Sequence, residues 1–388
     1  MKHIQQAGNL VIKSWCDNPE DGALDQAMNL ARLPFAFHHI ALMPDTHLGY
    51  GMPIGGVMAT KGVVVPNAVG VDIGCGVHAV QTSLTHITTP ALKELLSRIR
   101  ARVPVGVNKK HDEMQAEDLM PKKYMTSGMI IEREYKNARR SIGSLGSNNH
   151  FIEIQKGDDG HIWIMLHSGS RNLGKQIADH YNDLAVQLNE RYFSSVPTKW
   201  ELAFLPLEDA LGQAYLEEMQ YCVEFAAANR KLMMDRIFEE LYQLEPDVVR
   251  GPVIDVAHNY AAMENHFSRN VMVHRKGATS ARAGQLGIIP GSQGSASYIV
   301  RGKGNPDSFM SCSHGAGRKM GRKQAERTLN LEEEKRKLDE RGIIHSIRTS
   351  KDLAEATGGY NNIDVVMKEQ QDLVEIVTKL EPLAVIKG

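Results

Sequence analysis

With 388 residues, 42% hydrophobic and 23% charged, and a net charge of −1, the chain has the composition of a globular protein rather than a polycation. Its four cysteines lie far apart and form no CxxC pair, which argues against a disulfide framework or a zinc knuckle. The N-terminus has no apolar signal region, and no apolar run reaches the roughly 18 residues of a membrane helix, so we expect a cytoplasmic protein that contacts no membrane.

Apolar residues at alternating or helical spacing predict the elements along the chain. Strands are expected at 10–13, 37–44, 55–66, 77–82, 151–154, 162–167, 253–258 and 383–388. Helices are expected at 22–33, 89–102, 174–192, 207–244 and 317–338, the fourth as one helix or two. Asp45 and His47 follow the second strand and are expected in a polar turn, because aspartate favours turns.

Side chains of the kind that bind metals recur where predicted strands meet glycine turns. Asp72 and Cys75 lie three residues apart in a run of glycine and small aliphatic residues, where two bare charges are costly to bury without a cation. His150, His167 and His258 lie in similar contexts. Five ligands suffice for two divalent ions if the thiolate is shared. Zinc, manganese, iron and cobalt all fit this mixture of ligands.

The stretch from 271 to 317 is rich in glycine, serine and arginine. Small residues let the backbone approach a ligand, and successive N–H groups can bind phosphate oxygens. Within it, His314 lies among small residues four positions before Arg318. An imidazole nitrogen can act as a nucleophile toward phosphorus, and a nearby arginine can stabilise charge on the phosphoryl oxygens. The chain contains no Walker A motif and no Lys-x-Asp-Gly motif.

The segment from about 103 to 146 is irregular in pattern and locally basic, and we call it the basic lobe. It either meets a polyanion or is a solvated charged face. The polar blocks are spread from residue 45 to residue 318 without a linker, which favours one interwoven domain over 1–388. The helical part from about 174 to 245 is predicted to be an insertion in that domain.

Several motifs resemble, in their order along the chain, those of the RtcB family of RNA-splicing ligases. They are Asp72-Ile-Gly-Cys75, Asn149-His-Phe-Ile-Glu153, Leu166-His-Ser-Gly-Ser-Arg171, His258-Asn-Tyr, Lys276-Gly-Ala-Thr-Ser-Ala-Arg-Ala-Gly284, Pro290-Gly-Ser292 and His314-Gly-Ala-Gly-Arg318. The resemblance spans nearly the whole chain and implies an α+β fold, with mixed β-sheets and flanking helices around a central cleft for metal and nucleotide. Asn148 stands where the family usually has glycine, and asparagine tolerates a positive φ.

The resemblance implies an enzyme, a GTP-dependent 3′-phosphate/5′-hydroxyl nucleic acid ligase that uses two Mn²⁺ ions. It would act as a monomer and join an RNA 2′,3′-cyclic-phosphate or 3′-phosphate end to a 5′-hydroxyl end, in RNA splicing or repair. By this resemblance, His314 would attack the α-phosphorus of GTP, giving a histidine–GMP intermediate and pyrophosphate. GMP would then pass to the RNA 3′-phosphate, and the 5′-hydroxyl would displace it.

The resemblance also implies roles for individual residues. The metal ligands would be Asp72, Cys75, His150, His167 and His258. The nucleotide pocket would contain Asn149, Phe151, Glu153, His258, Asn259, Ser292, His314, Gly315, Ala316, Gly317, Tyr360 and Lys387. The contacts to phosphate or RNA would come from Asp45, Arg171, Lys109, Lys110, Arg139 and Arg140.

Two other functions would use the same cluster differently. A metal-dependent phosphoesterase acting on RNA ends would need the metal ligands but no nucleophile at His314. A non-catalytic protein that binds RNA ends during repair would have a degenerate site, and it is disfavoured because no expected ligand is missing.

Overall fold

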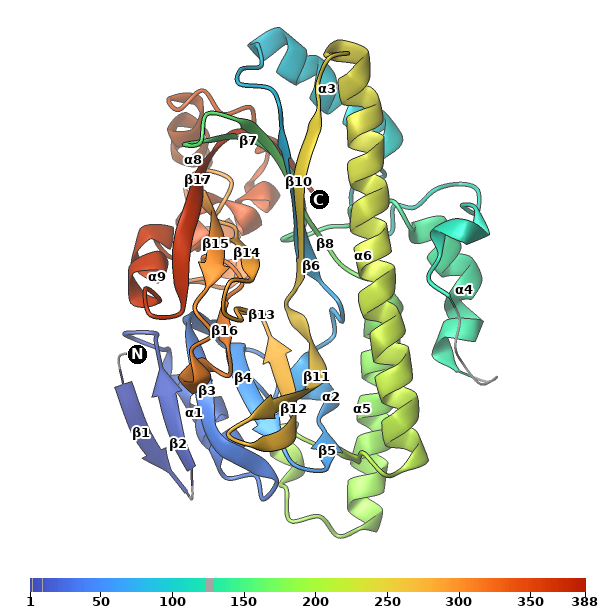
Figure 1. The fold of residues 1–388 in the computed structure, drawn as a ribbon, viewed down its shortest axis with the longest axis vertical. Coiled ribbons are helices and arrows are strands. Elements are labelled where there is room, and N and C mark those ends of the chain that lie inside the picture. The colour runs from blue at the N-terminus through green and yellow to red at the C-terminus, as the bar shows by residue number, and fades with distance from the viewer. Residues whose placement is uncertain (2, 9, 123–128) are drawn as a thin grey trace.

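The computed structural model describes residues 1, 3–8, 10–122 and 129–388. Two large β-sheets lie at its centre, and helices flank them (Figure 1). The helices are α1 (Asp21–Ala31), α2 (Pro66–Val69), α3 (Thr89–Arg102), α4 (Ile130–Ser141), α5 (Leu173–Arg191), α6 (Ala210–Leu244), α7 (Arg322–Thr328), α8 (Leu331–Asp339) and α9 (Ile363–Glu369). This arrangement confirms the predicted α+β class.

The first sheet has six strands, which carry the N-terminal part of the chain and a later hairpin. In spatial order they are β1 (His3–Ala7), β2 (Leu10–Ser14), β3 (Ala36–His47), β4 (Ile54–Thr60), β12 (Arg269–Lys276) and β11 (Asn259–His266). Strands β2 and β3 are parallel, and α1 makes the crossover that a parallel pair requires. The polar turn predicted at Asp45 is wrong, because β3 continues through Asp45 to His47 with an irregular register after Leu42.

The second sheet has seven strands, and every neighbouring pair is antiparallel. Its spatial order is β10 (Arg250–Ala257), β6 (Gly76–Thr82), β8 (Ile162–Ser168), β7 (Phe151–Gly157), β17 (Val374–Lys387), β15 (Ser297–Gly302) and β14 (Leu286–Ile289). Two small pairs are formed by β13 (Ala278–Ser280) with β16 (Ser311–Ser313) and β5 (Val63–Val64) with β9 (Leu205–Pro206). The chain passes from the second large sheet to the first at His258.

The segment 207–244, left open as one helix or two, contains the single 35-residue helix α6. It packs against α3 and α5, and its buried residues Met233, Met234 and Phe238 share a core with apolar residues of β7 and β8. Figure 1 shows α6 running along the second sheet, with α4 on its far side. Among the described helices, none combines the length and apolarity needed to cross a bilayer.

Two other helix predictions need correction. The basic lobe, predicted to be irregular, contains α4, which buries only Ile130, Ile131 and Ala138 along a highly charged sequence. Only three of its twelve residues are buried, and the many charged residues around them made the segment resemble an irregular surface stretch. The helix predicted over 317–338 is two short helices, because the side chain of Asn330 accepts a hydrogen bond from the Glu333 N–H and starts α8 anew. Residues 123–128 of the lobe lie outside the described residues.

Candidate metal and nucleotide site

The predicted metal ligands lie side by side at one end of the second sheet. In an antiparallel sheet the start of one strand adjoins the end of its neighbour. His258 follows the end of β10, Cys75 precedes β6, His167 is at the end of β8, and His150 precedes β7. The strand order β10-β6-β8-β7 therefore brings together four side chains that are far apart in the sequence.

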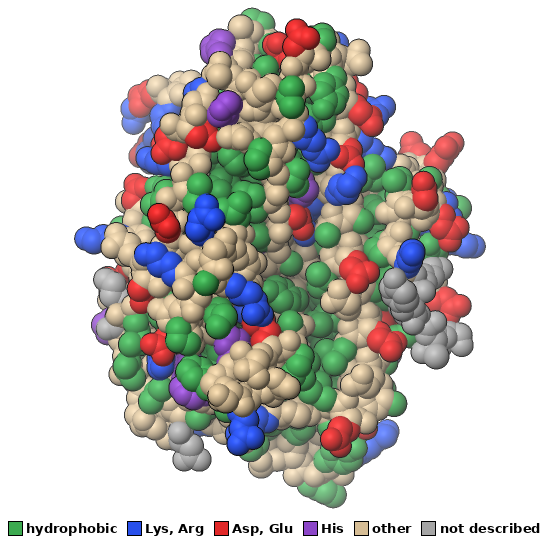
Figure 2. All heavy atoms as spheres, in the orientation of Figure 1, with side chains coloured by type: hydrophobic (Ala, Val, Ile, Leu, Met, Phe, Trp, Pro, Cys, Tyr) green, Lys and Arg blue, Asp and Glu red, His purple; other side chains and the backbone are tan. Residues whose placement is uncertain are grey.

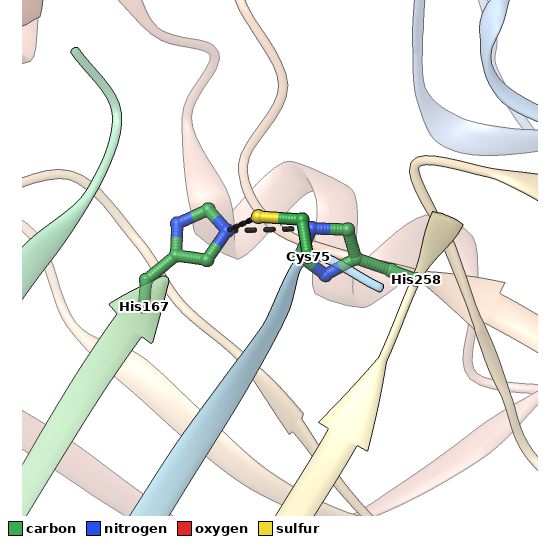
Figure 3. A group of neighbouring side chains, drawn as sticks. All are labelled: Cys75, His167 and His258. Atoms are coloured by element: carbon green, nitrogen blue, oxygen red, sulfur yellow. Dashed lines mark hydrogen bonds between the residues drawn. The ribbon is translucent and has the colours of Figure 1, made fainter. Parts of the chain in front are cut away.

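The thiol of Cys75 lies at the centre of this cluster. Its Sγ is 3.2 Å from Nε2 of His167 and 3.4 Å from Nε2 of His150. The two Nε2 atoms of His167 and His258 are 3.3 Å apart, and Figure 3 shows the His167 ring linked both to Sγ of Cys75 and to the His258 ring. Asp72 Oδ2 is 3.3 Å from Nε2 of His150. Among the described residues, Cys75 is thus shared between a first ligand group (Cys75, His167, His258) and a second ligand group (Asp72, Cys75, His150).

The chemistry of these donors fits divalent metal ions. Burial lowers the pKa of His150 and holds the pKa values of His167 and His258 well below the usual range, so the imidazoles are neutral and able to ligate. Burial and the charge of Asp72 raise the pKa of Cys75 well above its usual range, so a thiolate there requires a cation. Four donors about 2.1 Å from one ion lie about 3.4 Å apart in a tetrahedron, which matches the two donor–donor distances given above for each group.

His314 follows β16 and lies beside the first ligand group. Its ring centroid is 4.9 Å from that of His258. Its Nδ1 lies 2.7 Å from Oδ2 of Asp45, on β3, whose side chain is fully buried. A carboxylate accepts, so Nδ1 carries the proton and Nε2 keeps its lone pair. Gly317 allows this approach, because its φ is +70° and a Cβ there would be 2.6 Å from the Asp45 carbonyl oxygen.

Two residues that the family resemblance assigns to phosphate or nucleotide binding contact other groups in the structure. Asp45, expected to contact phosphate or RNA, is buried beneath His314 and accepts hydrogen bonds from it. Asn259, expected in the nucleotide pocket, donates from Nδ2 to the Asp72 carbonyl and accepts at Oδ1 from the Gly277 N–H. Asn259 therefore joins the metal-ligand loop to the segment that leads into β13.

One part of the predicted nucleotide pocket lies at the adjoining ends of β7 and β17. Lys387 Nζ is 3.4 Å from the Asn149 carbonyl oxygen and 5.2 Å from the centre of the Phe151 ring. Burial raises the pKa of Glu153 to about 7, although Lys387 acts in the opposite direction. Burial likewise lowers the pKa of Lys387. An acidic and a basic group are thus buried together beside the predicted metal ligands.

The other part surrounds Tyr360, which with Ser292 lines a cavity of about 400 Å³. The Tyr360 hydroxyl donates to Glu355 and accepts from Nη1 of Arg318. Glu355 lies 3.7 Å from Nζ of Lys387 and so connects the two parts of the pocket. Glu355 could not be recognised from the sequence, because it lies in a polar segment without a motif. Gly315 N–H donates to Asp45, so the segment Gly315–Gly317 also lines the site.

The turn before His150 contains an asparagine in the left-handed backbone conformation. Asn148 has a φ of +64°, a left-handed conformation that asparagine tolerates better than most residues other than glycine. Arg171 follows β8, and its Nη1 is 3.2 Å from Nδ1 of His150. Arg171 is half-buried, and its guanidinium places a positive charge beside the second ligand group.

The structure does not bring the basic lobe into this cluster. Arg139 donates from Nε to the Gln115 carbonyl, and Lys110 donates to Asn137, while Lys109 and Arg140 are exposed. Residues 103–146 contain eight basic and six acidic residues, so the lobe is only weakly basic. Figure 2 shows both signs of charge interspersed on the face that it displays.

Comparisons with known proteins agree with the geometry. A family model described as tRNA-splicing ligase RtcB matches residues 26–388. The RNA-splicing ligase RtcB of Escherichia coli K12 is 38% identical, over 98% of this chain and 98% of the relative. The tRNA-splicing ligase RtcB of Thermococcus kodakarensis is 33% identical, over 95% of this chain and 92% of the relative. The RNA-splicing ligase RtcB of Mycobacterium tuberculosis is 34% identical, over 94% of this chain and 100% of the relative.

Proposed function

We propose that this protein joins an RNA 2′,3′-cyclic-phosphate or 3′-phosphate end to a 5′-hydroxyl end with GTP and two Mn²⁺ ions. The chain belongs to the RtcB family and is an RNA-splicing ligase. The observation that carries this proposal is the position of His314. Its ring is oriented by a buried carboxylate and lies against a ligand of the first group. This arrangement supports a role for His314 as a nucleophile that acts beside a metal ion and a phosphate.

The first step would be the transfer of GMP to His314. Asp45 holds the proton on Nδ1, so the lone pair of Nε2 forms the bond to the α-phosphorus of GTP. The bond from that phosphorus to the bridging oxygen breaks, and pyrophosphate leaves. As Nε2 becomes bonded the ring gains positive charge, which the carboxylate of Asp45 stabilises.

The later steps would activate the RNA end and seal it. An oxygen of the RNA 3′-phosphate attacks the phosphorus of the bound GMP, and the N–P bond to His314 breaks. A cyclic phosphate end must first be opened by water to give such an oxygen. The 5′-hydroxyl then attacks the RNA phosphate, GMP leaves, and a phosphodiester bond is formed. GMP thus converts a poor electrophile into one with a leaving group.

The residues of the two ligand groups would hold the Mn²⁺ ions, with the thiolate of Cys75 between them. Bound metal would neutralise phosphate charge and lower the pKa of an attacking hydroxyl. The choice of Mn²⁺ comes from the family resemblance, since the ligands also suit other divalent ions. Arg171, which contacts His150, and Arg318, which contacts Tyr360 of the nucleotide pocket, would add charge-assisted hydrogen bonds to phosphate oxygens.

The pocket beside β7 and β17 would take the nucleotide. Phe151 offers an aromatic face, while Glu153 and Lys387 offer polar groups whose burial strengthens their hydrogen bonds. Tyr360 and Ser292 would close the outer side. We also propose that the enzyme acts as a monomer, because both ligand groups, His314 and Asp45 come from one chain. Light scattering of the purified protein tests the monomer.

The test is to supply two RNA strands with defined ends, together with GTP and Mn²⁺. We expect joining of a 3′-phosphate strand to a 5′-hydroxyl strand, and no joining of a 3′-hydroxyl strand to a 5′-phosphate strand. Loss of the terminal phosphate without joining would instead identify a phosphoesterase. Binding of the ends without any chemical change would identify the non-catalytic alternative.

A further inference from the structure

One buried guanidinium touches all three strand ends that carry the first ligand group. Arg230 lies on α6, and its side chain is almost completely inaccessible to solvent. Its Nη1 donates to the carbonyl oxygens of Gly74 at 2.9 Å and Ser168 at 3.1 Å. Its Nε and Nη2 donate to the two carboxylate oxygens of Asp255 at 2.7 Å and 2.8 Å. The fork is thus bound to β10 and to the segments at the ends of β6 and β8.

Each of these contacts lies close to a ligand. Gly74 immediately precedes Cys75, and Ser168 immediately follows His167. Asp255 is on β10, the strand that ends just before the third ligand. A guanidinium is planar, and its donors have fixed directions, so its partners must keep fixed positions relative to one another. Arg230 therefore couples the positions of three ligands that no local segment of sequence connects.

The backbone beside this side chain is fitted to it. A Cβ at Gly76 would be 3.0 Å from Cζ of Arg230 and would also collide with the carbonyl oxygen of Val256. Only glycine lets β6 and β10 pair closely enough for the guanidinium to reach both. Gly74 and Ser168 are buried. Without Arg230 each of their carbonyl oxygens would lose a hydrogen-bond donor.

We propose that Arg230 is a positioning residue that sets the spacing of Cys75, His167 and His258 for metal binding. This inference rests on the proposed metal function. Lysine at position 230 would keep the charge but has no planar fork, so it could not serve the carboxylate of Asp255 and both carbonyl oxygens in the same directions. The three ligand side chains would still be present, but they would no longer be held at the same positions relative to one another.

The experiment titrates the metal-free protein with Co²⁺ and follows its visible absorption, which reports the coordination geometry of the ion. We compare the parent with Arg230→Lys and with a matched control, Arg236→Lys. Arg236 is on the same helix and also donates to a backbone carbonyl, that of Gly143, but it touches none of the three strands. We expect Arg230→Lys to bind Co²⁺ about 10–100-fold more weakly, with an altered spectrum. Arg236→Lys should match the parent.

Unchanged Co²⁺ affinity and spectrum in Arg230→Lys would overturn the inference, and so would an equal loss in both variants, which would show a general loss of stability. If Arg230→Lys does not fold, Asp255→Asn is judged by the same criteria, because it weakens the bidentate bond that fixes the guanidinium. A parent protein that binds no Co²⁺ would instead contradict the proposed metal function, which distinguishes the two failures.

Discussion

Asp45 accepts three hydrogen bonds from the segment that carries His314, and all three reach the same oxygen. Nδ1 of His314 is 2.7 Å from Oδ2, the backbone nitrogen of His314 is 3.0 Å from it, and that of Gly315 is 3.2 Å from it. One buried carboxylate thus fixes the backbone, the ring and the tautomer together. It also joins the first sheet, through β3, to a site whose proposed metal ligands lie at the strand ends of the second.

Replacing Asp45 with asparagine tests this coupling. Because two backbone N–H groups also donate to this oxygen, the amide would keep its carbonyl oxygen there and Nδ1 would keep its proton, but the negative charge that stabilises the positively charged ring would be lost. We expect formation of the histidine–GMP enzyme from GTP to slow by on the order of 10²-fold, because a neutral amide stabilises the developing charge less than a carboxylate does. The control is Asp307→Asn, a carboxylate that binds Lys13 away from the site. A rate for Asp45→Asn equal to that control would count against the role.

Loss of the shared thiol should affect both ligand groups at once. We expect Cys75→Ala to abolish reaction with GTP and RNA joining, because each group would be left with two protein ligands. Cys222→Ala removes another buried thiol, on α6, and should retain both reactions. Excess chelator should inactivate the parent, and added Mn²⁺ should restore it. Full reaction with GTP in Cys75→Ala would contradict the shared-ligand arrangement.

The basic lobe gives a prediction about salt. Each single-stranded phosphate contact contributes about 0.7 to the slope of log binding constant against log salt concentration. Replacing Lys109, Lys110, Arg139 and Arg140 together by alanine should therefore flatten the slope for RNA binding by up to about 3. Reaction with GTP should be unchanged, because these residues lie outside the cluster. If the variant binds RNA normally but no longer reacts with GTP, the lobe supports the structure and does not bind RNA.

Glu153 predicts a pH dependence of stability. Burial raises its pKa to about 7 from about 4.5 in the unfolded chain. Between these values the native protein binds more protons than the unfolded chain, so this group lowers the free energy of unfolding as pH rises. Glu153→Gln does not titrate. Relative to the parent it should gain up to about 3 kcal/mol between about pH 5 and pH 8, measured by urea unfolding. The exposed Glu208→Gln should show no such gain.

Local sequence patterns predicted those helices and strands whose formation depends mainly on their own residues. Pro90 and the apolar spacing after it predicted a helix over 89–102, and α3 has those bounds. The pattern failed at α4, where few residues are buried, and at Asp45, where strand pairing and a bond to His314 override a local turn. Tertiary contacts of this kind have no signature in a short window.

Site residues could be predicted where a side chain able to bind a metal lies within a recognisable motif. Cys75 and the histidines are unusual residues at strand ends, and the structure places them together. Arg230 and Glu355 were not found, since each acts through contacts between segments distant in sequence. Nothing near Arg230 distinguishes it from other arginines on a long helix, and only the strand order shows what it touches.

The most direct test of the central claim is to incubate the protein with Mn²⁺ and GTP labelled at the α-phosphate, and then denature it. We predict covalent label on the parent, lost in acid and stable in alkali as expected of an N–P bond. We predict no label on His314→Ala, whose folding is checked by Co²⁺ binding to its intact ligand groups. Absence of label on the parent, or label that persists in His314→Ala, would contradict the account.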